Sequence, residues 1–528
     1  MKDYTKKQKI LIILGVAVFI LIGSGLTYAG LMWATSNPIN IGLTSGCFEI
    51  NYTPGGAINN ANVEVMNEST LISNSKFTIT DGIALTYANV GIKSTCTIEG
   101  YGSLYLNVTS LSSAFTTGSS KGSLKYAILN NTSSVSTPSV TNLKGQSFDI
   151  VKTGIISSTG TTEILKKQLS NSTQYKYLIV FYIDGSKIGN DVIGASFAGN
   201  ISADAHQGKL DFAKETLNYL KSLNSTITLA NDTPDFTKVS GNNGGKGDGT
   251  KGIYKSEDDL GTSYYFRGAV ENNYVKFANF YWRIIRINGD GSIRMIYAGT
   301  SAHANGYDDS SANDMSIGTS VFNSSYNDNT YVGYMYGTAG ATTYANTHSN
   351  TTNSTIKTKL DSWYDTNIVN TGNEGYIADA IYCNDRSVSS GTGIGTTVTY
   401  YAAKIRRNNG QPKLKCTNNS DKFTKSTTIG NGKLTKMIGL ITSDEVMYAG
   451  GTTSNNQEYY LYSGFWYWTM APYSFESGFA SVYGVDYGGV LSSYGVARTS
   501  GAVRPVVSLK SDAISGGSGT AESPFLVG

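Results

Sequence analysis

Histidine, the side chain that most often supplies acid–base or metal chemistry, is scarce in this sequence. The chain of 528 residues contains three histidines, His206, His303 and His348, and all three lie in polar stretches far from one another. Zinc sites and histidine-based catalytic sites need such side chains to converge in the fold. The sequence therefore predicts no catalytic residues, no metal site and no cofactor.

Carboxylates offer two further kinds of site. Asp308, Asp309 and Asp314 are oxygen ligands at loop spacing, but they lack a fixed Asp-x-Asp-x-Asp-Gly loop, so a solvated acidic turn is favoured over a calcium site. A glycan-active enzyme would need two carboxylates about 5 to 10 Å apart, which sequence spacing does not establish. We expect a protein that is not an enzyme and keep a glycan-active enzyme as the weakest alternative.

The four cysteines form two groups, Cys47 with Cys96 and Cys383 with Cys416. Neither pair has the C-x-x-C spacing of a metal or redox motif. An even number of cysteines in an exported chain is typical of disulfides formed in an oxidising compartment. We predict one disulfide in each group, with buried free thiols as the alternative.

The stretch from Tyr459 to Leu509 is rich in aromatic residues, glycine and serine. Tyrosine combines a large contact area with a polar tip, and the mixture of Tyr, Ser and Gly is typical of antibody binding loops. Because side chains alternate along a strand, Ala480 and Val482 are expected to point inward, and Ser481 and Tyr483 outward. The candidate ligand-binding residues are Tyr467, Tyr473, Phe475, Phe479, Ser481, Tyr483, Asp486, Tyr487 and Tyr494.

Two other residues of this stretch are expected to be structural. They are Trp468 and Arg504, and Arg504 lies in an apolar strand, where a buried arginine must pair with a carboxylate or with backbone carbonyls. An alternative for the whole stretch is an ordinary arrangement of core strands and turns, without a ligand face.

The composition excludes some classes of protein. Charged residues make up 15% of the chain, and 41 Lys and Arg against 38 Asp and Glu leave a net charge of +3. Such a small surplus does not neutralise a run of phosphates, so a nucleic-acid partner is disfavoured. The chain has 37 Tyr, against 18 Phe and 5 Trp, which suits a β-rich binding surface.

The N-terminus carries the clearest targeting signal. Residues 1–9 include Lys2, Lys6, Lys7 and Lys9, and they precede an apolar segment over residues 10–35. That segment is long enough to cross a bilayer, and the positive-inside rule keeps the lysines in the cytoplasm. We predict a single-pass signal-anchor helix with a cytoplasmic tail and an extracellular C-terminal region. A signal peptide cleaved near Thr27-Tyr28-Ala29 is the alternative.

Residues 39–207 have the pattern of an all-β sandwich. Gly91–Leu106, Ser123–Leu129, Gln174–Asp184 and Ala195–Ala205 are rich in β-branched and aromatic residues and are separated by turn-forming stretches. This region resembles the camelysin/TasA family of extracellular jelly-roll proteins in Leu124-Lys125-Tyr126, Gln174-Tyr175 to Asp184 and Phe197-Ala198-Gly199-Asn200-Ile201. The resemblance implies a surface stalk or fibre role, whereas any exported all-β domain would show similar strands.

Residues 208–254 are interpreted as a connection between two domains. Lys209–Leu223 places apolar residues at helical spacing, and Val239–Gly252 is a Gly-rich polar stretch typical of a flexible linker. The last domain is predicted over residues 255–528, with an Asn288–Gly291 hairpin turn between strands 275–287 and 292–297. Helices are expected over Ser354–Tyr364, where Trp363 belongs to the core stripe, and Ser443–Ala449.

The last domain resembles a family of exported gut-bacterial proteins with C-type-lectin-like domains. The residues that carry the resemblance are Tyr382-Cys383-Asn384-Asp385-Arg386, Ile438-Gly439-Leu440-Ile441-Thr442-Ser443-Asp444-Glu445, Tyr467-Trp468-Thr469-Met470 and Val503-Arg504-Pro505. It also resembles the variable proteins of diversity-generating retroelements, whose fold is related to formylglycine-generating enzymes. The enzymes of that superfamily need reactive cysteines near the C-terminal site, and none follows Cys416.

The resemblance implies an α+β C-type-lectin-like head whose ligand face can be diversified. Adenine-directed changes of Asn-type codons yield Tyr, Ser, Phe, Asp, Gly, Ala or Val but not Lys, Glu, Gln, Met or Trp. From Tyr473 to Arg504, only Glu476 is an amino acid that such codon changes do not yield. We therefore expect a membrane-anchored surface receptor or adhesin that binds a protein or glycan on cell or phage surfaces. A structural surface or biofilm-fibre protein is the main alternative.

Overall fold

The computed structural model describes residues 44–45, 48–58, 63–73, 76–94, 99–207, 210–308, 314–499 and 501–528. The predicted cytoplasmic tail 1–9, the predicted anchor 10–35 and the predicted Cys47–Cys96 pair lie outside these ranges. Within the ranges given, no helix combines the length and apolar character needed to cross a membrane. The chain is mostly β-sheet and divides into two compact units between Leu210 and Asp211.

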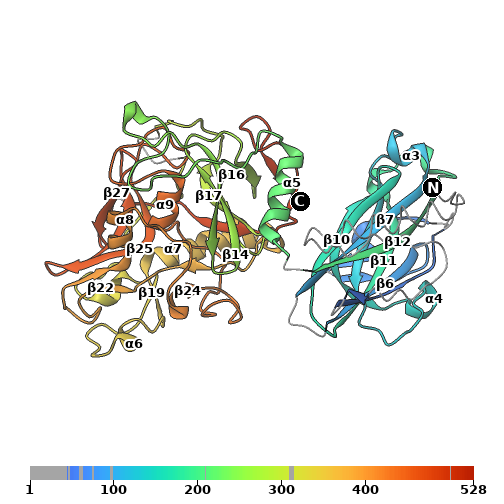
Figure 1. Ribbon diagram of the computed structural model, residues 1–528, viewed down its shortest axis with the longest axis horizontal. Helices are drawn as coiled ribbons and strands as arrows, with labels where there is room; N and C mark the ends of the chain where they lie inside the picture. The colour runs from blue at the N-terminus through green and yellow to red at the C-terminus, as the bar shows by residue number, and fades with distance from the viewer. Residues whose placement is uncertain are drawn as a thin grey trace, which may run out of the picture. The chain divides into compact units, whose positions relative to one another are not determined.

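The N-terminal unit contains two main sheets, in which every strand pair except the parallel β3–β11 pair is antiparallel (Figure 1). The larger has the order β1 (Thr44–Ser45), β2 (Phe48–Pro54), β6 (Ala84–Ser94), β11 (Gln174–Asp184), β8 (Leu124–Asn130), β9 (Ser147–Ile155), β5 (Lys76–Thr78) and β4 (Ile72–Ser73), and β3 (Val65–Met66) pairs with β11. The smaller has the order β10 (Gly160–Leu169), β7 (Gly100–Leu111) and β12 (Phe197–Gln207). The predicted strand 174–184 is confirmed, whereas the predicted strand 91–106 spans the end of β6 and the start of β7.

From Tyr177 to Ile183, strand β11 is apolar at every position because both of its faces are buried. Ile179 and Phe181 join a core that includes residues of both sheets. Leu178 and Val180 face a second core, to which α2 (Glu68–Leu71) and α4 (Val140–Leu143) contribute one leucine each. Burial on both faces explains a continuous hydrophobic run where a one-sided strand would alternate.

Among its described residues, the C-terminal unit combines two larger sheets with five α-helices (Figure 1). One sheet contains β13 (Gly252–Asp258), β14 (Gly261–Arg267), β16 (Phe280–Ile287), β15 (Tyr274–Phe277), β31 (Phe525–Val527) and β30 (Ile514–Gly516), with β17 (Ile293–Gly299) and β29 (Val506–Leu509) attached through β16. The other contains β18 (Thr319–Ser320), β28 (Gly501–Ala502), β25 (Tyr467–Glu476), β23 (Thr399–Tyr401) and β22 (Val388–Ser390), with β26 (Phe479–Val485) and β27 (Leu491–Gly495) attached through β25. The helices are α5 (Phe212–Leu223), the one-turn α6 (Tyr344–Thr347), α7 (Thr355–Tyr364), α8 (Ala402–Asn409) and α9 (Ser443–Ala449).

The helix ends follow from local side-chain chemistry. The Ser354 side chain accepts from the Lys357 amide and starts α7, as predicted. Helix α9 is also confirmed, but its cap is Thr442, which forms a reciprocal capping box with Glu445. Asp211 caps α5, so this helix begins three residues after the predicted start at Lys209.

The segment predicted as one strand over 275–287 is a hairpin in its own right. Ala278 and Asn279 have φ of 51° and 67°, and they reverse the chain between β15 and β16. Two consecutive residues with positive φ fit a tight hairpin turn whose twist matches that of its strands. The predicted turn at Asn288–Gly291 is confirmed between β16 and β17.

The interpretation of Val239–Gly252 as a flexible linker is wrong. Val239 and Thr250 are buried, and Asp248 forms an ion pair of 2.8 Å with the buried Arg267. The amide of Gly249 donates to the carbonyl of Gly241. These bonds give the polar groups of this segment partners inside the C-terminal unit, which begins at Asp211 and not at residue 255.

Candidate functional site

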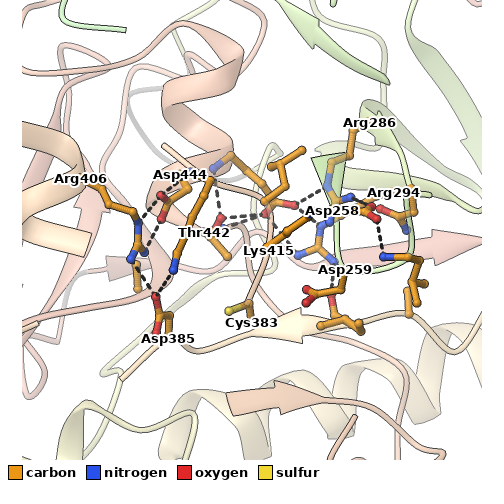
Figure 2. Close-up of a pocket in the computed structure, with 18 residues that line it drawn as sticks. Asp258, Asp259, Arg286, Arg294, Cys383, Asp385, Arg406, Lys415, Thr442 and Asp444 are labelled. Carbon is orange, nitrogen blue, oxygen red and sulfur yellow. Dashed lines mark hydrogen bonds and ion pairs between the residues drawn. The ribbon is translucent and has the colours of Figure 1, made fainter. Parts of the chain in front are cut away.

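A small charged cavity lies inside the C-terminal unit, between α9, the β16–β17 hairpin and the segments that carry Asp385 and Arg406 (Figure 2). Its volume is about 40 Å³, which is room for a few water molecules and not for a substrate of ordinary size. The arginines and carboxylates that line it come from parts of the chain far apart in sequence.

Glu445, on α9, is the centre of one half of this network. Its carboxylate forms ion pairs with Arg294 at 2.5 Å and with Arg286 at 3.1 Å, and Arg286 also binds Asp258 at 2.6 Å. Burial opposes ionisation of Glu445, but the two arginines outweigh burial and hold the pKa of its carboxyl below the ordinary value. Glu445 therefore ties the start of α9 to the β16–β17 hairpin.

Arg406, on α8, is the centre of the other half. Its Nε and Nη2 donate to the two carboxylate oxygens of Asp444 at 2.6 and 2.9 Å, and its Nη1 donates to Asp385 at 2.8 Å. Burial raises the pKa of Asp385, but Arg406, the hydrogen bonds from Ser387 and the charge of Lys413 together outweigh burial and leave this pKa lowered. This bidentate pair fixes α8 against α9.

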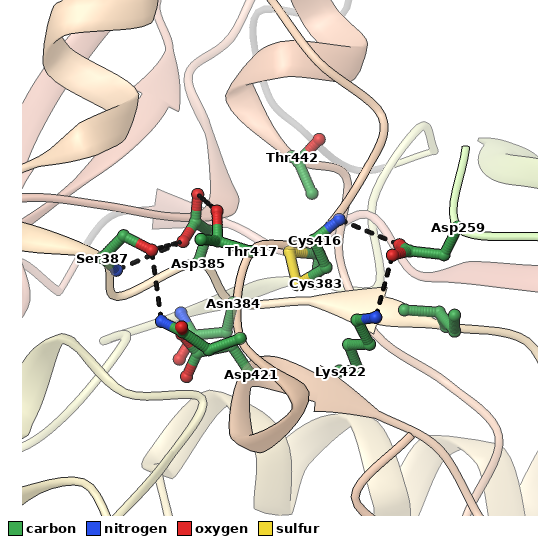
Figure 3. Close-up of a disulfide and its surroundings, with 12 residues drawn as sticks. Asp259, Cys383, Asn384, Asp385, Ser387, Cys416, Thr417, Asp421, Lys422 and Thr442 are labelled. Atoms are coloured by element: carbon green, nitrogen blue, oxygen red, sulfur yellow. Dashed lines mark hydrogen bonds and ion pairs between the residues drawn. A yellow bond between two sulfur atoms is a disulfide. The ribbon is translucent and has the colours of Figure 1, made fainter. Parts of the chain in front are cut away.

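The disulfide predicted between Cys383 and Cys416 is confirmed, with a Cα–Cα distance of 5.7 Å (Figure 3). The amide of Cys416 donates to the Asp259 carboxylate at 2.9 Å, and Asp259 forms an ion pair with Lys422 at 2.9 Å. The bridge therefore joins two loops that also contact the charged network. Cys47 and Cys96 lie outside the described residues, and their pairing stays a prediction.

The chemistry of the cavity is that of a structural network. Each of its five carboxylates, Asp258, Asp259, Asp385, Asp444 and Glu445, has a cationic partner. Asp385 and Glu445, whose pKa values are lowered, are poor proton donors. Across the part of the chain that the structure describes, no group of three His, Cys, Asp or Glu side chains could hold a metal ion.

The predicted ligand face is only partly at the surface. Phe479 and Tyr487 are 51% and 57% exposed, but they lie at opposite ends of β26, because Phe479 begins the strand and Tyr487 follows it. Tyr473, Ser481 and Tyr494 are half-buried. The predicted residues therefore do not form one continuous exposed face.

The expectation that Tyr483 points to solvent is wrong. Its side chain is buried, as is that of its neighbour Val482. Helix α8 packs on this side of the sheet: the guanidinium of Arg407 lies 5.9 Å from the Tyr483 ring centroid and donates to the carbonyl of Leu491. A helix about 75 residues earlier in the chain therefore covers the face that alternation assigns to solvent.

Tyr467 and Phe475 are also buried, contrary to a place on an exposed face. Tyr467 donates its hydroxyl to the carbonyl of Leu461, and Phe475 lies between the neighbouring strands β23 and β26. The Asp486 carboxylate accepts from the amides of Gly488 and Val490, so it stabilises the turn between β26 and β27.

The two residues predicted to be structural are both buried. Trp468 donates from its indole to the carbonyl of Ser320 at 2.8 Å. Arg504 donates to the carbonyls of Tyr297 and Leu461 at 3.1 and 2.8 Å, which is the backbone pairing that its apolar surroundings predict. Burial lowers the pKa of the Arg504 guanidinium.

Sequence reasoning missed Tyr326 as a neighbour of the exposed hairpin. Its ring stacks on Phe479 with a centroid distance of 5.3 Å and an interplanar angle of 19°, and it is 42% exposed. The amide of Ala480 donates to the Tyr326 carbonyl at 2.7 Å, which fixes this loop beside β26. Tyr326 and Phe479 together are called the aromatic pair below.

The fold and these sites define a β-rich protein of two units, with a cross-linked C-terminal unit in which Phe479 of the β25–β26 hairpin and Tyr326 of a neighbouring loop form an exposed aromatic pair. No protein-family model matches the chain, and a search of curated proteins found no match.

Proposed function

We propose that this protein is a membrane-anchored bacterial surface protein whose C-terminal unit is a C-type-lectin-like head that binds protein or glycan ligands. The lysine-rich residues 1–9 and the apolar residues 10–35 support the anchor. The jelly-roll-like N-terminal unit is the stalk of this arrangement, and the partners are molecules on cell or phage surfaces.

The observation that carries the proposal is the aromatic pair. Tyr326 and Phe479 keep about half of their surfaces in water although they stack on each other. Exposed apolar surface is costly unless a partner covers it, and two rings stacked between a hairpin and a neighbouring loop present a preorganised contact. The ion-pair network and the disulfide cross-link other parts of the same unit.

The aromatic pair can be tested by measuring retention of the labelled full-length chain on whole bacterial cells and on phage particles. We expect Tyr326→Ala/Phe479→Ala to lower retention by about tenfold or more, the effect of losing a binding hot spot. Leu526→Ala removes another exposed apolar side chain, 48% exposed and on the other large sheet, and should leave retention unchanged. Equal retention of all three chains would refute this site.

Diversification, in this proposal, is limited to positions that the fold leaves accessible. Phe479, Ser481 and Tyr487 can vary without opening the core, whereas changes at Val482 or Tyr483 would leave a cavity. A near-copy of this gene segment that differs at adenines, beside a reverse transcriptase gene, would support diversification. Its absence would leave a binding head of fixed specificity.

Fibre formation is distinguished by assembly of the purified chain. A receptor should keep one sedimentation coefficient as its concentration rises, whereas a fibre subunit should assemble progressively. Assembly that persists in the Tyr326→Ala/Phe479→Ala variant would favour the structural alternative over the receptor.

A further inference from the structure

The large apolar side chains that the N-terminal unit exposes among its described residues all lie at one end of this unit, called the tip below. They are Val65, Ile155, Ile188 and Ile193, with exposed fractions of 43%, 51%, 41% and 85%. Val65 lies beside the end of β11, and Ile155 lies beside the start of the neighbouring β8. Ile188 and Ile193 belong to the loop that joins β11 to β12. Figure 1 shows α3 (Ser113–Thr116) at the tip and α4 toward the other end of the unit.

Hydrogen bonds hold the loop between β11 and β12 in one conformation. The Asp191 carboxylate accepts from the amide of Ser119 at 2.7 Å and from the hydroxyls of Ser119 and Ser120 at 2.8 and 2.6 Å. Val192 packs against the core of the unit, whereas Ile193 next to it stays in water. Because the loop is preformed, its isoleucines cannot withdraw from water without breaking these bonds. Exposed apolar surface of this kind marks a contact site.

Two lysines are the free cations beside this loop. Lys187 belongs to the loop, and Lys121 follows the two serines that bind Asp191. Both lysines are exposed, and neither forms an ion pair with a residue that the structure describes.

The carboxylates at the tip face other groups. Asp184 and Glu68 form ion pairs with Lys125 at 2.7 and 2.8 Å. Asp191 faces the serines that bind it, and the Glu64 side chain lies against the turn that precedes β6. A partner of the loop therefore meets two isoleucines and two ammonium groups.

The combination of isoleucine and lysine suits a lipid surface better than a protein partner. Protein interfaces concentrate Tyr, Trp and Arg in hot spots and are depleted of Lys. None of the four exposed side chains at the tip is aromatic. A peripheral membrane contact instead buries apolar side chains at the boundary between headgroups and acyl chains, and lysines beside them attract anionic lipid. Charge complementarity therefore selects a bilayer that contains anionic lipid.

The chain enters and leaves the N-terminal unit at the end opposite the tip. Strand β2 begins at Phe48, which pairs with Ser94 at the end of β6, and β12 runs away from the tip to Gln207. The 11 residues of β11 span about 36 Å between the two ends. Residues 36–43, between the predicted anchor and β1, can extend over about 26 to 29 Å at most. This reach is too short to invert the unit and bring the tip to the membrane that holds the anchor.

We propose that the tip inserts Ile188 and Ile193 into a bilayer that contains anionic lipid, with Lys121 and Lys187 at the headgroups, and that this bilayer is not the one that holds the anchor. The protein thereby connects two membranes, a role separate from ligand binding by the aromatic pair. The choice of the second membrane rests on the proposed anchor, whereas the lipid contact does not.

The test uses the full-length chain in nanodiscs of phosphatidylcholine, which hold the predicted anchor in a neutral bilayer. The probes are vesicles with about 30% phosphatidylglycerol in phosphatidylcholine and vesicles of phosphatidylcholine alone. We expect the discs to float with the anionic vesicles and at least about tenfold less with the neutral ones, because each lysine contributes roughly fivefold to binding of anionic lipid. Elution of the chain with the discs reports the anchor separately, so failures of the anchor and of the tip are distinguishable.

Two variants connect flotation to the tip. Ile188→Ser/Ile193→Ser should lower flotation with the anionic vesicles by about tenfold or more, because it removes the apolar groups that enter the bilayer. Lys121→Gln/Lys187→Gln keeps much of the side-chain length and should remove the preference for anionic lipid. All four positions are exposed, so both variants should fold as the original chain does.

The matched control is Val398→Ser/Ile405→Ser, which removes two side chains of the C-terminal unit that are 55% and 46% exposed and should leave flotation unchanged. Equal flotation of the original chain and the isoleucine variant would overturn the proposal. Pairing of the discs without vesicles, lost in the isoleucine variant, would assign the tip to a second copy of the chain. The absence of both flotation and pairing would assign it to a foreign protein and would also overturn the lipid contact.

Discussion

Removal of the Cys383–Cys416 disulfide gives the most direct test of how the C-terminal unit is stabilised. The perturbation is Cys383→Ala/Cys416→Ala, which leaves the surrounding ion pairs, such as Asp259 with Lys422, in place. The bridge joins residues with a sequence separation of 33. Without it, the unfolded chain regains the freedom of that whole loop.

The expected loss follows from the entropy of loop closure. For a loop of this length the entropy relation gives about 12 to 13 cal/mol/K, which is about 3.8 kcal/mol at 25 °C. The C-terminal unit, Asp211–Gly528, has roughly 320 residues, and its unfolding entropy is about 2.1 cal/mol/K per residue. The loss should therefore lower the melting temperature of this unit by about 6 °C.

Tryptophan fluorescence isolates the unit in which the change is made. Four of the five tryptophans, Trp282, Trp363, Trp466 and Trp468, lie in the C-terminal unit, and the fifth, Trp33, lies in the predicted anchor. The matched control is Cys47→Ala/Cys96→Ala, which changes the other predicted pair and should leave this fluorescence transition unchanged. A double variant of Cys383 and Cys416 that melts within about 1 °C of the original chain would refute the loop-entropy reasoning.

Four further results are expected. Glu445→Gln should destabilise the C-terminal unit by about 3 to 5 kcal/mol in urea unfolding, because it leaves buried arginines without their carboxylate. Because folding lowers the pKa of Glu445, its contribution to stability is present above its ordinary pKa of 4.5 and is lost as the pH falls below that value. The stability of the variant should therefore depend less on pH in this acidic range. Folding also lowers the pKa of His348, from 6.5 to about 3, so on acidification the unfolded chain binds a proton at this imidazole before the folded chain does. The free energy of unfolding should therefore fall by roughly 1.5 kcal/mol between pH 6.5 and 5. His348→Phe should remove this pH dependence, and an unchanged dependence of stability on pH would contradict the burial of a neutral imidazole. Tyr483→Ala should cost about 3 kcal/mol or more, whereas Phe479→Ala should cost less than about 1 kcal/mol, and equal losses would contradict the placement of these two rings. Protease added to intact cells should degrade the chain beyond Thr35, and full resistance would contradict the predicted topology.

Several elements could be predicted because short stretches of sequence determine them. Gln174–Asp184 is a strand as expected, since its apolar and β-branched residues suit no other element of that length. The turn at Asn288–Gly291 depends on residues that tolerate positive φ, and α7 begins at a serine that caps its own helix. The pairing of Cys383 with Cys416 followed from cysteine number and grouping alone.

Other features depended on contacts between distant parts of the chain, and the sequence contained no local sign of them. Alternation placed Tyr483 at the surface, but α8 covers that face of the sheet. The Gly-rich segment 239–252 has the composition of a linker, yet it is fixed because Arg267, a later residue, pairs with Asp248. Composition describes what a segment prefers in isolation, and a single buried ion pair can override it.

The amino-acid sequence by itself determined the β-rich character, the positions of several strands and helices, the cysteine pairing in the C-terminal unit and the expectation of a membrane anchor. Only the tertiary structure decided which aromatic rings are exposed and that Tyr326 joins Phe479 at the surface. It also decided that the exposed large apolar side chains of the N-terminal unit, among its described residues, gather at the tip. The physical reason is that exposure and hydrogen-bond satisfaction are properties of a residue's neighbours in space, which the loops and α8 bring from far along the chain.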